Sequence, residues 1–462
     1  MKSSIYQLYI LLLLSVSLFM GCKKEATTTV AVTPAAAANL TAILISNTRI
    51  QLTWTDKSDN ESGFRICRKT VGGIYAIIDS VTANVTSYTD TTAPQASTSI
   101  YFVQAYTKDG NLRNNSNEVS ITTKGWGELG GLNALGANDQ IATLVNDAMG
   151  NIYVGGYFRD SLGKQYVAKW DGSRWSKLGG SGFNGDIESI TTDAAGNVYV
   201  GGMFVNNSYN YYVAKWDGSS WSELGGTNTL GANAMINNVT ADVNGNIYVS
   251  GSFDNYSGKF YVLKWNGTTW TELGQSSNFY FTSSITSQAV DLAGNVYVSG
   301  TFTNASGKYY VAKWNGSTWT ELGGINSLNA NKNIYRIATD ASGNIYAAGD
   351  FTNANGNSYV AKWDGNSWTE LGGNNSLAAN HSIYIISTDA MGNIYVGGAF
   401  SNSNGKKYIA KWDGTNWTEY GGTNSLAVSG PINGIVNIAG NIYAAGSFMN
   451  SSGKYYVAKY TK

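Results

Sequence analysis

Apolar and polar positions recur in blocks through the C-terminal three quarters of the chain. In the copy at residues 334–373, four short apolar runs alternate with turns rich in Asn, Asp and Gly. Gly343 can take a positive φ in the first turn, and Asp364-Gly365 is a strong signal for a short hairpin. The pattern predicts four strands, at residues 334–339, 345–351, 358–363 and 368–371.

These copies form a regular array. The Gly-Asn pair that opens the second run recurs about every 46 to 49 residues, at Asn151, Asn197, Asn246, Asn295, Asn344, Asn393 and Asn441. Four short strands in each repeat of this length are typical of a propeller blade. The motifs Asp-x-x-Gly-Asn-hydrophobic-Tyr and Ala-Lys-Trp-Asp-Gly-x-x-Trp resemble those of bacterial β-propeller repeat families, over residues 125–462. That resemblance implies a fold and leaves the activity open.

The two ends of the array are complementary. The last copy stops after its third run, at residues 455–460, whereas an orphan fourth run, Trp-Gly-Glu-Leu, lies at 126–129 before the first copy. Pairing the two would close the ring and protect both edges. We therefore expect an all-β protein: a fibronectin type III-like sandwich followed by a seven-bladed β-propeller closed by an N-terminal strand, three strands plus one.

The start of the chain predicts export. Residues 1–21 are apolar after Lys2, which suits a signal peptide. Leu18-Phe-Met-Gly-Cys22 resembles the bacterial lipobox, and Cys-Lys-Lys-Glu is similar to lipoproteins of the Bacteroidota. The resemblance implies a lipidated, palmitate-bearing Cys22 that anchors the protein in the outer membrane, on either the periplasmic or the surface side. Ordinary cleavage near a chance cysteine is the alternative. Residues 22–38 suit a flexible tether.

Residues 39–124 predict a separate small β-domain, because short alternating strands are separated by turn clusters. Leu52-Thr-Trp54, Ser87-Tyr-Thr-Asp90 and the run at 101–106 resemble a fibronectin type III domain, which implies a spacer or interaction module. Cys67 lies within an alternating strand, so we expect a buried free thiol.

Composition excludes several functions. The chain has 30 Lys+Arg and 30 Asp+Glu, and only 13% of its residues are charged, so we expect no nucleic-acid partner. His381 is the only histidine, which excludes a His-centred metal site or a Ser-His-Asp triad. We expect no metal, no cofactor and no catalysis.

Three residue types repeat in nearly every copy. We interpret the repeated Asp, as at Asp340, as an acceptor of turn N–H groups rather than a calcium ligand. The Lys of each Ala-Lys-Trp is expected to be solvated or paired with an acid. Paired Trp residues suit packing between sheets, with stacking on sugar rings as the alternative. The pairs are Trp170/Trp175, Trp216/Trp221, Trp265/Trp270, Trp314/Trp319, Trp363/Trp368 and Trp412/Trp417.

A ligand site would need residues that break the repeat. In known propellers the first strand of each blade lines a central channel, and the loops that enter it shape one face. The candidates there are Asp139, Asp186, Glu188, Asn237, Tyr335, Tyr384 and His381. They suit hydrogen bonding and stacking on a polar, carbohydrate-like ligand, and drift in exposed loops is the alternative.

The leading hypothesis is therefore a lipid-anchored, monomeric binding or scaffold protein of the cell envelope, with a glycan or an envelope protein as its partner. A carbohydrate-active hydrolase or lyase that uses Asp186, Glu188 and one of the two candidate tyrosines is the alternative, because two carboxylates can support glycoside hydrolysis. A purely structural envelope protein is the third hypothesis.

Overall fold

The computed structural model describes residues 32–462 except 47, 256–257 and 275–279. The predicted signal peptide, Cys22 and most of the predicted tether lie outside these residues. The described chain is all-β apart from short 3₁₀ helices at η1 (Gly131–Asn133), η2 (Gly324–Asn326), η3 (Gly373–Asn375) and η4 (Gly422–Asn424). Among the described residues, none of the helices has the length and apolar character needed to cross a membrane.

The N-terminal part is a sandwich of two sheets. One sheet has the order β1 (Ala38–Ser46), β2 (Arg49–Thr55), β5 (Ser87–Asp90). The other has the order β4 (Ala76–Thr82), β3 (Gly63–Thr70), β6 (Thr98–Tyr106), β7 (Arg113–Asn115), and β8 (Val119–Thr122) also pairs with β6. Alternate residues of β6 are buried, as its sequence predicts. Cys67 is buried and free, which confirms the expected thiol.

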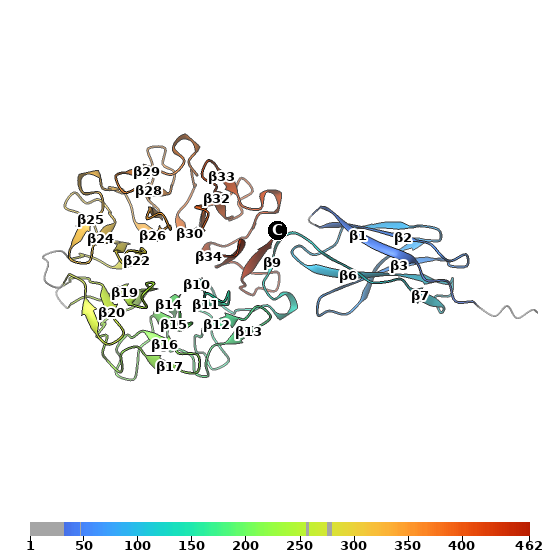
Figure 1. Ribbon diagram of the computed structural model, residues 1–462, viewed down its shortest axis with the longest axis horizontal. Coiled ribbons are helices and arrows are strands. Elements are labelled where there is room, and N and C mark those ends of the chain that lie inside the picture. The colour runs from blue at the N-terminus through green and yellow to red at the C-terminus, as the bar shows by residue number, and fades with distance from the viewer. Residues whose placement is uncertain (1–31, 47, 256–257, 275–279) are drawn as a thin grey trace, which may run out of the picture.

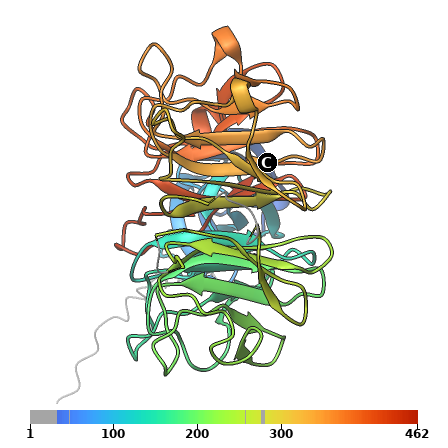
Figure 2. The same cartoon turned by 90° about the vertical axis from the view of Figure 1, so that its left-hand side faces the viewer.

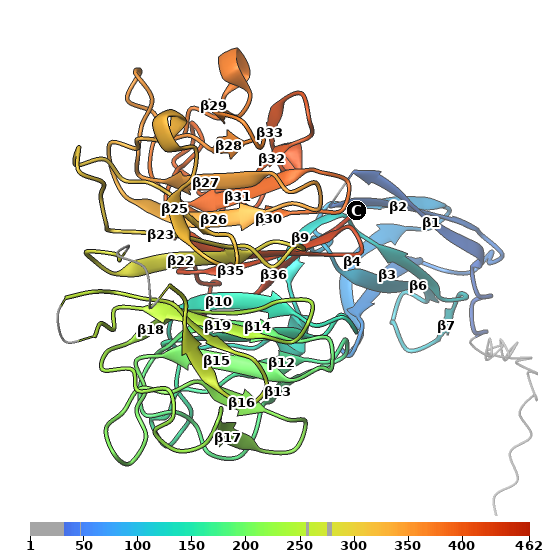
Figure 3. The same ribbon diagram turned by 60° about the vertical axis from the view of Figure 1, so that its left-hand side comes forward.

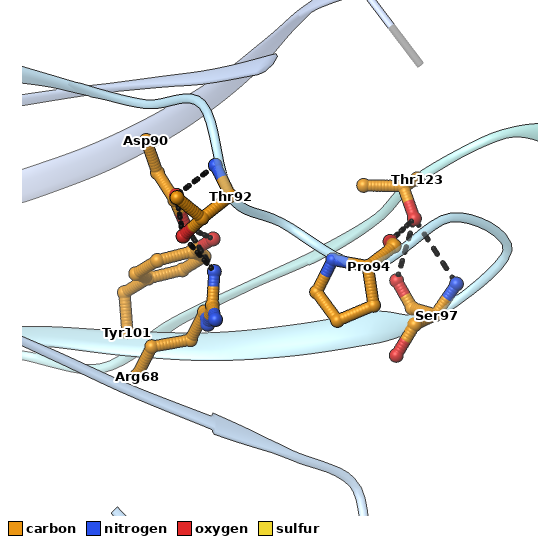
Figure 4. A network of polar contacts seen from close by, with 7 residues as sticks. All are labelled: Arg68, Asp90, Thr92, Pro94, Ser97, Tyr101 and Thr123. Atoms are coloured by element: carbon orange, nitrogen blue, oxygen red, sulfur yellow. Dashed lines mark hydrogen bonds and ion pairs between the residues drawn. The ribbon is translucent and has the colours of Figure 1, made fainter. Parts of the chain in front are cut away.

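A polar network fixes the loop that joins the two sheets (Figure 4). The fully buried Asp90 accepts hydrogen bonds from the Tyr101 hydroxyl (2.7 Å), Arg68 (2.6 Å) and Thr92. Burial by itself would raise the pKa of Asp90, but the hydrogen bonds outweigh it and the pKa is lowered. The carboxylate therefore stays ionised in the core of the sandwich.

The sandwich and the ring are joined by two residues, because β8 ends at Thr122 and β9 (Gly125–Glu128) belongs to the ring. The buried Thr123 hydroxyl donates to the carbonyl oxygens of Pro94 and Ser97 (Figure 4). A Cβ added at Gly127 would lie 2.8 Å from the Cβ of Ala96, so the loop packs directly on β9.

The ring contains seven four-stranded antiparallel sheets within the described chain. Their first strands are β10 (Ile141–Asn146), β14 (Ile187–Thr192), β18 (Ile236–Ala241), β22 (Ile285–Val290), β26 (Ile334–Thr339), β30 (Ile383–Thr388) and β34 (Ile432–Ile438). Their second strands are β11 (Ile152–Gly156), β15 (Val198–Gly202), β19 (Ile247–Gly251), β23 (Val296–Gly300), β27 (Ile345–Gly349), β31 (Ile394–Gly398) and β35 (Asn441–Gly446).

The outer half of each sheet is made of shorter strands. The third strands are β12 (Ala168–Trp170), β16 (Ala214–Trp216), β20 (Leu263–Trp265), β24 (Ala312–Trp314), β28 (Ala361–Trp363), β32 (Ala410–Trp412) and β36 (Ala458–Thr461). The fourth strands are β13 (Trp175–Lys177), β17 (Trp221–Glu223), β21 (Trp270–Glu272), β25 (Trp319–Glu321), β29 (Trp368–Glu370) and β33 (Trp417–Glu419), and the last sheet takes β9 instead.

The sheets stand radially around one centre, with the first strands innermost (Figure 1), and Figure 2 shows the same ring from its edge. Neighbouring first strands pack against each other, and β34 packs against β10, so the circle is closed. Each hydrophobic core lies between two adjacent sheets; Tyr199 of one, for example, packs with Val239 and Phe253 of the next. This is the architecture of a β-propeller.

The predicted pairing of the two ends is confirmed. β9 runs antiparallel to β36, with Trp126 opposite Tyr460 and Glu128 opposite Ala458 (Figure 3). The four strands predicted for the copy at 334–373 are also present, although the third begins only at Ala361. Ser358, expected to start it, instead bridges Thr352 and Ala379.

The repeated side chains hold the ring together. The second Trp of each pair donates its indole N–H to a Leu carbonyl of the preceding sheet; Trp417, for example, donates to Leu371 O (3.1 Å). Equivalent bonds are made by Trp175, Trp221, Trp270, Trp319 and Trp368. The interpretation of these tryptophans as packing between sheets is therefore confirmed.

The repeated aspartates cap turns, as predicted. Asp340 accepts the backbone N–H groups of Ser342 and Asn344 on one oxygen, and the Asn344 amide and the Tyr346 hydroxyl on the other. The repeated lysines make a contact that the sequence did not predict. Six of them lie over the ring of that same repeated tyrosine, at 5.5–5.8 Å in a cation–π contact, as Lys411 does over Tyr395.

Candidate functional site

Every first strand carries a β-bulge at its second residue. The register shifts between the first and third residues, so the second residue has no partner of its own on the adjacent strand. The bulged residues are Ala142, Glu188, Asn237, Thr286, Tyr335, Tyr384 and Asn433. Four of the predicted ligand residues therefore lie at the bulge, where the backbone changes the direction of the side chain.

Some of these side chains donate hydrogen bonds to backbone carbonyls of the next sheet. Asn237 Nδ2 donates to the carbonyl of Ile285 (2.9 Å), and Asn433 Nδ2 donates to that of Ile141 (3.3 Å). The Thr286 hydroxyl donates to Ile334 O (3.4 Å). Asn237, predicted as a ligand residue, thus fastens two neighbouring sheets together.

The predicted acids gather around Tyr157, which the sequence did not single out. Burial and the charges of Glu188, Asp186 and Asp139 raise the pKa of the Tyr157 hydroxyl to about 12. Burial and the charge of Asp186 also raise the pKa of Glu188, against a hydrogen bond from Tyr157 that lowers it. Asp186 accepts a hydrogen bond from Gln165 (2.6 Å). The three acids therefore form one group at the start of β10 and β14.

The two predicted tyrosines form a second group. Their rings lie 5.9 Å apart and edge to face, and the Tyr335 hydroxyl donates to Asp350 (3.1 Å). Arg336 Nε donates to the carbonyl of Tyr384 (3.4 Å). His381 is exposed, and its Nδ1 accepts the backbone N–H of Ser382 (3.0 Å). The contacts of the described residues give no link between this group and the acids.

Two cavities that the sequence analysis missed lie farther out on the ring. We call them the outer cavities, of about 380 Å³ beside β16 and β17 and about 330 Å³ beside β32 and β33. Each lies between the loop that enters the sheet and the outer two strands of that sheet. Equivalent residues line both: Tyr212, Ala214, Trp221, Ser222 and Glu223 in the first, and Tyr408, Ala410, Trp417, Thr418 and Glu419 in the second.

Ring contacts and hydrogen bonds fix the side chains that line the second outer cavity. Tyr408 packs edge to face on the buried Phe400, with ring centroids 5.0 Å apart. Trp417 is fixed by its bond to Leu371 O. Glu419 accepts hydrogen bonds from Asn402 Nδ2 (3.0 Å) and from the Ser425 hydroxyl. The cavity therefore presents a fixed pair of aromatic rings beside a fixed carboxylate.

The same residue types occupy these positions in the other sheets. The tyrosines are Tyr166, Tyr212, Tyr261, Tyr310, Tyr359, Tyr408 and Tyr456, and every fourth strand begins with or contains a Trp followed two residues later by Glu, or by Lys177 in β13. Repetition was the signal that could have found them. The sequence favoured packing for the repeated tryptophans, with stacking on sugar rings as the alternative, and a repeated side chain can pack and line a cavity together.

No group of three or more His, Cys, Asp or Glu side chains suited to a metal ion occurs in the described part of the chain. No protein family model matches the sequence, and no curated protein matches it.

Several solved structures resemble the fold. A polysaccharide lyase described as an ulvan lyase of family PL25 is 13% identical, over 71% of this chain and 95% of that one, with a TM-score of 0.42. The Aleuria aurantia lectin in complex with a fucosyl-GlcNAc disaccharide is 18% identical, over 61% and 94%, with a TM-score of 0.38. A structure titled as a myokine is 21% identical, over 20% and 98%, with a TM-score of 0.18. At such TM-scores none of them carries weight in assigning a function.

Proposed function

We propose that this protein binds carbohydrate at the outer cavities of a seven-bladed propeller, without catalysis, in the cell envelope. The observation that carries the proposal is the recurrence of one arrangement, a Tyr, a Trp and a Glu under an entering loop, at equivalent places in two sheets. Residues 39–124 act as a fibronectin type III-like spacer, and each four-stranded sheet of 125–462 is one blade.

The chemistry of the cavities suits a sugar. Aromatic side chains pack against the apolar face of a sugar ring, and carboxylate and amide groups pair with its hydroxyls. Volumes of about 330–380 Å³ lie at the small end of ligand sites, which run from about 300 to 1,000 Å³. A small ligand, or one short segment of a polysaccharide, fits that size.

The test is binding of the soluble chain to a glycan array. Ser222 and Thr418 are exposed residues that line the two cavities, so Ser222→Tyr with Thr418→Tyr should fill them without disturbing the core. Thr415→Tyr is the matched control, because Thr415 is exposed in the turn between β32 and β33 and lines neither cavity. Glycan binding that the double variant loses and the control keeps supports the proposal. Binding to no glycan would shift the assignment to a protein ligand or a structural role.

We also propose that Cys22 is acylated and that the mature protein is held in the outer membrane by its lipids. The support is the sequence Leu18-Phe-Met-Gly-Cys22 after an apolar segment. More than one acyl chain makes such an anchor stable, where a single chain is marginal. Metabolic labelling with a palmitate analogue should mark the native chain and not Cys22→Ser, and the variant should leave the membrane fraction. Equal labelling of both would refute the anchor.

A hydrolase or lyase is the second candidate function. Its support is the acid group around Tyr157, since burial and the charge of Asp186 raise the pKa of Glu188, and a carboxyl with a raised pKa suits general acid catalysis. Turnover of a polysaccharide that disappears in Glu188→Gln and persists in Thr418→Tyr would favour this function over binding alone.

A further inference from the structure

The two outer cavities differ in charge. Glu419 is the charged residue that lines the cavity beside β32 and β33. The cavity beside β16 and β17 is lined by Glu223 and also by Lys164, which comes from the loop of the preceding sheet. One cavity is therefore acidic, whereas the other holds charges of both signs.

The Glu419 carboxylate is positioned to bind hydroxyl groups. Asn402 and Ser425 hold it with two donated hydrogen bonds, and an ionised carboxylate offers about four acceptor positions. The remaining positions can accept hydroxyl groups from a ligand. Burial and the charge of Glu419 raise the pKa of Tyr408, so that hydroxyl stays protonated and can donate.

The position of the Glu419 carboxylate is set by a contact that recurs in the repeat. In several sheets, the side-chain amide of an Asn in the loop after the second strand donates a hydrogen bond to the carboxylate of the Glu in the fourth strand. The Nδ2–Oε distances are 2.9–3.2 Å. These pairs are Asn206–Glu223, Asn304–Glu321, Asn353–Glu370, Asn402–Glu419 and Asn450–Glu128. The sheet of β10–β13 departs from them, because Asp160 and Lys177 form an ion pair of 2.6 Å at the same two positions.

We propose, on the basis of the carbohydrate binding proposed above, that the Glu419 cavity selects uncharged glycans and rejects sulfated or carboxylated ones. A fixed carboxylate beside two aromatic rings accepts hydroxyl hydrogens and repels a second anion. In the other cavity Lys164 offsets part of this repulsion. Glu419 is therefore the main determinant of the selectivity for uncharged over anionic glycans.

The test compares neutral polysaccharides (dextran, laminarin and mannan) with a chemically sulfated form of each, on the soluble chain without residues 1–22, at low salt. The native protein should bind at least one neutral polymer, and sulfation should weaken that binding at least about fivefold, the order that one like-charge contact near water gives. In Glu419→Gln the ratio of the affinity for the neutral polymer to that for its sulfated form should fall towards one. Glu223→Gln should change it less, and Asp59→Asn, an exposed acid of the sandwich, should not change it.

A purely structural role of Glu419 would change the affinities for both polymer forms together, whereas charge selection changes their ratio and weakens at 1 M salt. Equal or tighter binding of the sulfated polymers by the native protein would overturn the selectivity and leave carbohydrate binding in place. Binding of no polymer in either form would overturn both the selectivity and the proposed function.

Discussion

Glu188 shows how one buried charge links stability to pH. Its pKa is raised by burial and by Asp186, so the native state holds a proton more tightly than the unfolded chain does. Ionised Glu188 therefore destabilises the fold above its raised pKa. This cost fades as the pH falls and is absent below the ordinary Glu pKa of about 4.3.

Glu188→Gln should accordingly raise the melting temperature at pH 7 and lose that advantage near pH 4, because the neutral amide has no charge to bury. Thermal unfolding of the native chain and the variant at both pH values measures this difference. Asp59→Asn, in an exposed position, should show no such dependence. A destabilised Glu188→Gln at pH 7 would mean that the carboxylate has partners that stabilise it.

Gln288 is a polar residue at an apolar position. The equivalent residues of the other first strands are Leu144, Ile190, Val239, Ile337, Ile386 and Ile435. Gln288 is 7% exposed, and neither its amide oxygen nor its nitrogen has a hydrogen-bond partner among the described residues. Burying an unpaired amide costs about 1–3 kcal/mol.

Gln288→Ile should therefore stabilise the ring by about 1–3 kcal/mol. The reciprocal change, Ile337→Gln, should destabilise it by a similar amount or more. Urea unfolding of both variants against the native chain measures the free energies. A loss of stability in Gln288→Ile would indicate that an internal water satisfies the amide.

Among the elements, the strand that closes the ring differs from its six counterparts. The indole N–H of Trp126 in β9 is buried without a partner in the described chain, whereas that of Trp417 in β33 donates to Leu371 O. Trp126 instead packs among aromatic rings, 6.2 Å from Tyr420 and 5.4 Å from Tyr460. The closing junction thus replaces a hydrogen bond with aromatic contacts.

Replacing each Trp by Phe isolates this difference, because both changes remove a similar apolar area. Trp417→Phe should cost about 1 kcal/mol more than Trp126→Phe, since only the former breaks a hydrogen bond and leaves a carbonyl unpaired. Chemical unfolding of the two variants supplies the comparison. Equal losses would show that the Trp126 N–H also has a partner.

Much of the element structure followed from the sequence because its signals are local. Gly343 and Asp364-Gly365 indicated the turns, and the short apolar runs between turns indicated strands such as Ile334–Thr339. The bulges did not follow, because a regular strand would place residues two apart, such as Asp186 and Glu188, on one face, and the sequence gives no signal for the register shift between Ile187 and Ser189. The cation–π contact of Lys411 did not follow from the sequence either, because its partner Tyr395 is 16 residues earlier, on the adjacent strand.

At the scale of the whole molecule, the unpaired runs at both ends of the array were enough to predict the closing pair β36 and β9. The outer cavities were not predictable in that way. Each is formed where the loop entering a sheet covers the third and fourth strands, and its size depends on side-chain positions that spacing does not give. The variable residues near the centre drew attention instead, and Asn237 among them fastens neighbouring sheets.

The central claim is that ligand binds at the outer cavities rather than near the centre of the ring. The most direct measurement is a crystal structure of the soluble chain soaked with the best hit of the glycan array. The account predicts sugar density against Tyr408 and Trp417, with a hydroxyl on Glu419. Density instead beside Tyr335 and Tyr384, or around Glu188, with both outer cavities empty, would contradict it.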